Sequence, residues 1–142
     1  MPSEAAQTGL SGVLETCLYA HDLDAAATFY GDVLGLEFVS RSEGRHVFFR
    51  CGSQMVLIFN PDATNDPEGT LPPHGAEGAG HVAFGVTEAE LDGWRSRLRS
   101  RNVEIEKDME WGEAGQSIYV RDPAGNSVEL ATPSIWPVDA GT

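Results

Sequence analysis

The sequence predicts an α+β fold built from two βαβββ modules. The first observation is a repeat: a strand-like apolar run, an amphipathic helix and three further strand-like runs occupy residues 12–60 and again 80–133. The second is a segment at 61–79, rich in proline, glycine and acidic residues, which is too long for a turn and reads as a linker. The third is the period of the repeat, roughly 65–70 residues, which indicates an internal duplication. Residues 1–11 and 134–142 are then an N-terminal extension and a C-terminal tail.

Alternating apolar residues predict the strands, and a 3.6-residue apolar period predicts the helices. In the first module we expect a helix from about residue 23 to 34 and strands at 12–20, 36–42, 45–51 and 54–60. In the second module we expect a helix at 88–101 and strands at 80–86, 103–108, 116–121 and 127–132.

Local signals mark the ends of both helices. Asp22 is a suitable N-cap for the first helix, and Gly35 supplies its C-terminal stop. Thr87 to Glu90 has the capping-box pattern that begins the second helix. The arginines at 95, 97, 99 and 101 complement the helix dipole, and we interpret them as a solvated face rather than an anion site.

Composition narrows the class of protein. The net charge of −13 argues against partners such as nucleic acid and against a membrane surface, because both reward positive charge. No apolar run is long enough to span a bilayer, and the first dozen residues lack the pattern of a signal peptide. We therefore expect a cytoplasmic protein. Cys17 and Cys51 lack a CxxC spacing, and we expect small buried residues rather than a disulfide or a nucleophile.

Three isolated ionisable residues stand inside apolar strand-like runs: Glu15 in GVLETCLYA, His81 in GHVAFGV and Glu129 in GNSVELA. Such a residue is costly to bury unless it is paired or ligated. Side-chain alternation places all three on the face of their strands opposite the helices. One imidazole and two carboxylates suit a divalent metal such as Zn, Ni, Mn or Fe. The alternatives are a satisfied strand histidine and glutamates that face water or pair with arginine.

The same alternation brings other residues to this open face: His46, Phe48, Ser117, Tyr119 and Arg121. Of these, His46, Phe48, Tyr119 and Arg121 are the candidates for substrate binding. His46 is either a proton carrier or a polar wall residue. Arg121 either binds a substrate anion or forms an ion pair with its neighbour Asp122. In the linker, His74 is either part of a lid or a solvated loop residue.

Three motifs resemble the vicinal oxygen chelate superfamily, which includes glyoxalase, bleomycin-resistance and extradiol dioxygenase proteins. They are HDLDAAATFYGDVLGLEFV, GHVAFGV and RDPAGNSVEL, and the resemblance covers about residues 12–132. It implies that each module curls into a half-barrel and that paired half-barrels enclose a cleft. It also implies metal ligands from the first and fourth strands of the modules, where Glu15, His81 and Glu129 match. The fourth position falls at the apolar Val56 or Leu57, and Glu15 stands where the usual first ligand is histidine.

The resemblance implies a divalent-metal-dependent enzyme acting on a small oxygenated substrate, as a lyase, isomerase or dioxygenase. Glu129 is then the narrowly preferred catalytic base over Glu15. Members of the superfamily often pair modules across subunits, so we expect a homodimer. The alternative is a non-catalytic protein that binds and sequesters a small molecule, such as an antibiotic, as bleomycin-resistance proteins do. A structural dimer without a small-molecule function is a third reading.

Overall fold

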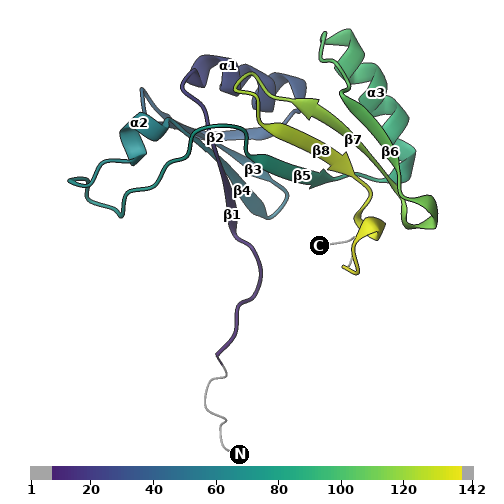
Figure 1. The fold of residues 1–142 in the computed structure, drawn as a ribbon, viewed down its shortest axis with the longest axis horizontal. Coiled ribbons are helices and arrows are strands. Elements are labelled where there is room, and N and C mark those ends of the chain that lie inside the picture. The colour runs from purple at the N-terminus through teal and green to yellow at the C-terminus, as the bar shows by residue number, and fades with distance from the viewer. Residues whose placement is uncertain (1–7, 139–142) are drawn as a thin grey trace, which may run out of the picture.

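Two four-stranded sheets, one from each module, form the body of the protein. The computed structural model describes residues 8–138 (Figure 1). The first sheet has the order β1-β4-β3-β2, from β1 (Glu15–Tyr19), β2 (Glu37–Ser42), β3 (His46–Cys51) and β4 (Gln54–Phe59). The second has the order β5-β8-β7-β6, from β5 (His81–Gly85), β6 (Lys107–Glu110), β7 (Gln116–Arg121) and β8 (Ser127–Ala131). The predicted α+β fold of two βαβββ modules is confirmed, and each sheet is an open half-barrel.

The strand pairing repeats between the modules. In each sheet the first strand lies parallel to the last strand, and the remaining pairs are antiparallel. Glu15 pairs with Met55 and Cys17 with Leu57, just as His81 pairs with Ser127 and Ala83 with Glu129. The repeat therefore makes Glu15 equivalent to His81, and Leu57 equivalent to Glu129.

Helices cover one face of each sheet. The first module contributes α1 (Leu23–Ala27) and the π-helix η1 (Thr28–Val33), and the second contributes the 3-10 turn η2 (Glu88–Glu90) followed by α3 (Leu91–Ser100). The linker forms the short helix α2 (Pro61–Thr64), and the second module adds the 3-10 turns η3 (Gly112–Ala114) and η4 (Pro133–Ile135). In Figure 1, α1 and α3 lie along one side of the molecule and leave the other face of the sheets uncovered.

The predicted helix ends are confirmed. The Asp22 side chain accepts a hydrogen bond from the Ala25 backbone N–H, and Gly35 adopts the left-handed conformation with φ of 75°. Thr87 and Glu90 form the reciprocal capping box. Two expectations differ from the structure. The first helix changes to π geometry after Ala27, and the strand expected at 103–108 begins only at Lys107. Val103 and Ile105 instead pack against the core ahead of the strand.

The two helix-side faces share one apolar core. Buried residues from both modules belong to it, among them Leu18, Tyr30 and Val47 from the first and Val82 and Val128 from the second. Removing these side chains from water supplies the main driving force for folding. The helix-side faces are therefore filled by packing, and the opposite faces of the sheets are left uncovered (Figure 1).

A buried carboxylate joins the two modules at the RDPAGNS turn. Asp122 Oδ2 accepts a 2.6 Å hydrogen bond from the Tyr30 hydroxyl and a 2.9 Å bond from Asn126 Nδ2. Asp122 Oδ1 accepts from the backbone N–H groups of Ala124 and Asn126. Burial, and then the neighbouring carboxylate, raise the pKa of Tyr30, so its hydroxyl keeps the proton that it donates.

Asn126 extends this connection to the first strand of each module. Its Nδ2 also donates to the carbonyl oxygen of Tyr19 in β1, and its Oδ1 accepts from the Gly80 backbone N–H just before β5. Gly80 lies so close to β1 that a Cβ there would be 3.2 Å from the Leu18 side chain. The sheets therefore meet along β1 and β5.

Arginines of α3 form a second connection between the modules. Arg97 donates to the carbonyl oxygens of Val33 and Asp32, and Arg101 donates to that of Asp32. These carbonyls lie at the C-terminal end of η1, where a positive charge is favourable. The interpretation of the arginines as a solvated face holds for the exposed Arg99 and Arg101 but not for the half-buried Arg97. Arg95 is also half-buried, and it is paired with Asp92 and Asp108.

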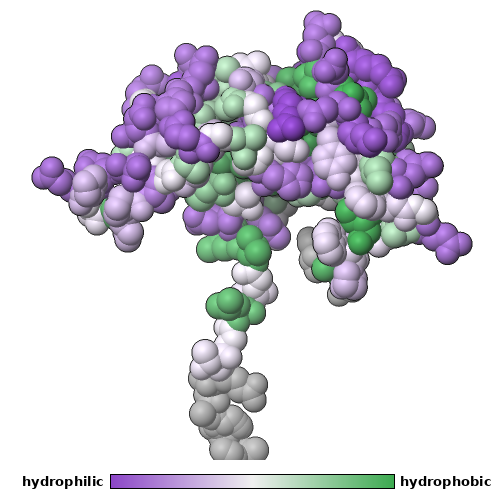
Figure 2. All heavy atoms as spheres, viewed as in Figure 1, coloured by the Kyte–Doolittle hydropathy of each residue, from purple (hydrophilic) through white to green (hydrophobic). Residues whose placement is uncertain are grey.

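The chain preceding β1 extends away from the body (Figure 1). It carries three exposed apolar residues, Leu10, Val13 and Leu14. Figure 2 shows hydrophobic, green atoms along this extension. In residues 8–138, no helix is long and apolar enough to cross a membrane.

Replacing Tyr30 tests the connection between the modules. Tyr30→Phe removes a buried hydrogen bond to a carboxylate, and we expect the free energy of unfolding to fall by about 1–3 kcal/mol. Urea denaturation followed by circular dichroism measures this change. Tyr19→Phe is the matched control, because its hydroxyl bonds the exposed His74, and it should change stability by less than about 0.5 kcal/mol. Equal effects of the two variants would contradict the prediction.

Candidate functional site

His81 and Glu129 form a close pair on the open face of the second sheet. Nε2 of His81 lies 3.3 Å from Oε1 of Glu129, although the residues are on different strands, β5 and β8. The Glu129 side chain is only 8% exposed, whereas the His81 side chain is 51% exposed. The structure thus brings together two of the three predicted metal ligands.

The hydrogen bonding of His81 determines which of its ring nitrogens faces Glu129 without a hydrogen when the ring is neutral. Its Nδ1 lies 3.0 Å from the carbonyl oxygen of Ser127, which can only accept a hydrogen bond, so Nδ1 carries a hydrogen. In the neutral ring, Nε2 then presents a lone pair toward the Glu129 carboxylate. Two facing lone pairs repel unless a cation lies with them, either a second proton on the ring or a metal ion. A histidine held by a carbonyl on its far nitrogen is the usual arrangement of a metal ligand.

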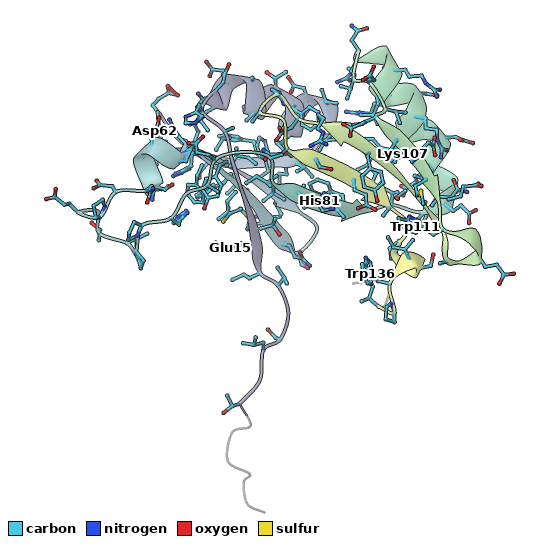
Figure 3. The ribbon with its side chains drawn as sticks, viewed as in Figure 1. Glu15, Asp62, His81, Lys107, Trp111 and Trp136 are labelled. Atoms are coloured by element: carbon cyan, nitrogen blue, oxygen red, sulfur yellow. The ribbon has the colours of Figure 1, made fainter. Side chains whose placement is uncertain are left out.

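Glu15 does not join this pair within one chain. It is exposed at the start of β1, where the extended N-terminal segment enters the sheet (Figure 3). In the described part of the chain, the side chains of Glu15, His81 and Glu129 do not all come within 4.8 Å of one another. The donor set on the second module is therefore one imidazole and one carboxylate.

The first module has no carboxylate at the position equivalent to Glu129. That position is Leu57, which is 6% exposed and pairs with Cys17 of β1 and Phe48 of β3. The open face of the first module therefore offers an apolar surface where the second module offers an imidazole and a carboxylate.

Aromatic rings dominate the open face of the first module. The rings of His46 and Phe48 stack with centroids 3.8 Å apart, and Phe59 packs edge-on against both. Arg45 donates to Nδ1 of His46 at 2.9 Å. Burial, and then the positive charge of Arg45, lower the pKa of His46, which keeps the ring neutral near pH 7. Of the two readings of His46, this environment favours the wall residue.

The linker adds a residue to the same face that the sequence left undecided. His74 Nδ1 and the Tyr19 hydroxyl are 2.7 Å apart, and the His74 ring packs edge-on against Phe59 at 4.9 Å. His74 is therefore an exposed loop residue that is also bonded to β1 through Tyr19. Side-chain alternation predicts that Tyr19 lies on the open face. It cannot predict the contact with His74, because the conformation of a loop leaves no periodic pattern in the sequence.

The two remaining substrate-binding candidates lie on β7. Tyr119 pairs with Glu129 in the ladder, and its ring is stacked near His81 with centroids 6.4 Å apart. Arg121 forms an ion pair with Glu106 at 2.7 Å and donates to the Gly125 carbonyl. The predicted ion pair with Asp122 is wrong, because the Asp122 carboxylate is turned inward to Tyr30 and Asn126.

The cysteines differ from expectation in one respect. Both are free thiols, but Cys17 is exposed on the open face and only Cys51 is partly buried. Although the residue is exposed, neighbouring atoms partly desolvate its thiol; this desolvation, and then the nearby Glu15 carboxylate, raise the pKa of Cys17. The thiol is therefore held in its protonated, weakly nucleophilic form.

A second group of possible ligands lies outside the open faces. His21 is within 3.3 Å of Asp62 and 3.4 Å of Glu77, and the ligand atoms of the three lie within 4.8 Å of one another. All three residues are exposed, and both nitrogens of His21 already face carboxylates. The group is an exposed polar cluster that holds the linker against the chain just after β1.

The fold agrees with the comparison to known proteins. The family model of the Glyoxalase/Bleomycin resistance protein/Dioxygenase superfamily matches residues 12–130, and the chain belongs to this superfamily. The crystal structure of a lactoylglutathione lyase from Agrobacterium tumefaciens matches with a TM-score of 0.87 at 43% sequence identity, covering 92% of this chain and 100% of that chain.

Two curated relatives are more distant in sequence. Metallothiol transferase FosB from Shouchella clausii is 26% identical over 133 residues, which are 87% of this chain and 81% of the relative. A probable lactoylglutathione lyase from Vibrio parahaemolyticus is 25% identical over 128 residues, which are 83% of this chain and 88% of the relative.

The environment of His46 yields a direct prediction. We expect its pKa to lie below the ordinary value of 6.5, and Arg45→Gln to raise it while leaving it below 6.5, because the larger cause, burial, remains. Titration of the ring Cε1–H signal by NMR measures both values. Arg50→Gln, on the same strand but paired with Glu37, should leave the pKa unchanged. An equal shift in both variants would contradict the assigned role of Arg45.

Proposed function

We propose that the protein is a divalent-metal-dependent enzyme that acts on a small oxygenated substrate, as a lyase or isomerase of the glyoxalase type. The observation that carries this proposal is the geometry of His81, whose Nδ1 is held by a carbonyl while Nε2 faces the shielded carboxylate of Glu129. The similarity to a lactoylglutathione lyase at 43% identity supports the reaction class.

A second copy of the chain completes the metal site in this proposal. His81 and Glu129 of one copy and Glu15 of the other supply one imidazole and two carboxylates, a set that suits Zn, Ni, Mn or Fe with positions left for substrate. The separation of Glu15 from the pair within one chain supports this arrangement. The apolar residues of the extended N-terminal segment, unpacked within one chain, also fit a homodimer.

The residues have distinct roles in the reaction. When bound, the metal polarises a substrate oxygen and stabilises negative charge that develops on it. Glu129 is the group that takes or returns a proton, because its carboxylate is shielded from water and already adjoins the site. Tyr119 lines the same face beside His81, and the first module supplies the opposite, largely apolar wall.

One observation favours a second function. Leu57 replaces a carboxylate, and aromatic rings cover that face, so a cleft could hold an apolar compound without metal. This is the non-catalytic, small-molecule-sequestering alternative. Metal content separates the two functions, because sequestration needs none.

Metal binding and activity test the proposed enzyme together. Protein stripped with a chelator and reloaded with Zn, Ni, Mn or Fe should retain about one ion per chain after gel filtration. Glu129→Gln should weaken binding of the ion at least about 100-fold and abolish turnover of mandeloylglutathione, the phenyl analogue of lactoylglutathione, because it removes an anionic ligand. Elemental analysis and absorbance spectroscopy measure the two effects.

Glu77→Gln provides the control for this experiment. It alters the exposed His21–Asp62–Glu77 cluster, so metal content and turnover at the proposed site should be unchanged. If Glu77→Gln loses the metal and Glu129→Gln retains it, the metal binds at the surface cluster and the proposal is wrong. Absence of metal in the reloaded wild-type protein would favour sequestration.

Mixing two inactive variants tests whether the site is shared between copies. In a symmetric dimer, a chain with Glu15→Gln paired with a chain carrying Glu129→Gln retains one intact site out of two. After subunit exchange, the equimolar mixture should therefore recover about one quarter of wild-type metal sites and activity. A site formed within one chain predicts no recovery from mixing.

A further inference from the structure

The first module presents a continuous aromatic surface on its open face. We call the rings of His46, Phe48, Phe59 and His74 the aromatic wall. They come from β3, β4 and the linker, and neighbouring ring centroids lie between 3.8 and 5.9 Å apart. The wall is built rather than incidental, since His74 is fixed by its bond to Tyr19 and His46 by its bond to Arg45.

The wall leaves rings available to a ligand. Phe59 and Leu57 are buried at its base, whereas His46 and Phe48 are only half-buried and His74 is exposed. Offset stacking and edge-on packing of rings favour a planar π-system over a saturated group of equal size. The wall therefore selects for flat, unsaturated molecules.

A positive charge stands at the edge of the wall. The Arg45 guanidinium lies 5.5 Å from the centroid of Phe59, and among residues 8–138 no carboxylate lies within ion-pair distance of it. Its guanidinium instead contacts two rings of the wall, since it lies over Phe59 and donates to Nδ1 of His46. A guanidinium beside aromatic rings is suited to an anionic group carried by a ring.

A cavity of about 310 Å³ adjoins this charge. Arg45 and His74 both line it, together with residues of α2 and the linker. Asp66 lines it as well, but its Oδ1 accepts the Glu68 backbone N–H and so serves the loop. The cavity gives the anionic group of a ligand room to reach Arg45.

We propose that the aromatic wall binds a small aromatic or conjugated acid, with its ring packed against the accessible faces and edges of the stacked His46–Phe48 pair and its anionic group at Arg45. The inference rests on the proposed function, because it describes the substrate of the cleft whose opposite wall carries His81 and Glu129. It narrows that substrate from a small oxygenated molecule to a planar, anionic one.

Binding of 2-naphthoate, followed by NMR amide shifts of the metal-free protein, tests the inference. We expect shifts that cluster on β3, β4 and His74. Arg45→Gln should weaken 2-naphthoate roughly 10-fold, the loss of one charge-assisted contact, while 2-naphthylmethanol changes less than about 2-fold. Phe48→Leu should weaken both probes by about 5-fold, and Phe48→Tyr, which keeps the ring, should restore them. Arg50→Gln, whose guanidinium is paired with Glu37, is the matched control and should change neither.

Two results would overturn the inference. The saturated analogue decahydro-2-naphthoate binding as tightly as 2-naphthoate would show that ring stacking is not selected. If Arg45→Gln weakened the binding of 2-naphthoate and of 2-naphthylmethanol equally, Arg45 would not recognise the negative charge of the ligand. Glu129→Gln separates this inference from the proposed function, since it should lose metal and turnover but keep 2-naphthoate binding. If the protein bound 2-naphthoate at the aromatic wall but took up no metal, the proposed ligand site would be supported and the proposed metal-dependent enzyme would be rejected.

Discussion

The buried carboxylate of Asp122 is the interaction on which the arrangement of the two modules depends. Its four hydrogen bonds join the first module's Tyr30 to the turn that precedes β8. Through Asn126, the same turn holds the β1 and β5 strands side by side. A buried charge is tolerated only when its hydrogen bonds are satisfied, so the turn has one geometry. Glu129 therefore enters β8 in the register that brings it to His81.

The sequence predicted those features that follow from periodicity. Alternation alone placed His81 and Glu129 on one face, and the structure finds them 3.3 Å apart. The contacts that it did not predict are long-range and polar. Asp122 is separated from Tyr30 by 92 positions and Tyr19 from His74 by 55, and no local pattern encodes such pairs. The predicted partner of Arg121, Asp122, was wrong for the same reason. The Asp122 carboxylate is bonded to the distant Tyr30, and Arg121 pairs with Glu106 instead.

The duplication has produced two faces of opposite character on one scaffold. Leu57 and Glu129 occupy equivalent positions of the repeat, but one is apolar and the other is charged. The residues around each of them differ in the same way. The first face is made of rings and a lone guanidinium, and the second of an imidazole and a shielded carboxylate. In the proposed enzyme, binding and chemistry are thus divided between the modules, and both faces lie outside the shared core.

This division constrains how a cleft can form. The sheets of one chain meet along β1 and β5, which leaves their open faces side by side rather than facing each other. Pairing two first modules would enclose rings without metal donors, and pairing two second modules would enclose donors without an apolar wall. In the proposed homodimer, the first module of one copy faces the second module of the other, and a twofold axis then generates two identical clefts. Only this pairing places Glu15 opposite His81 and Glu129. It is also the only pairing in which a substrate lies between the aromatic wall and the proposed metal.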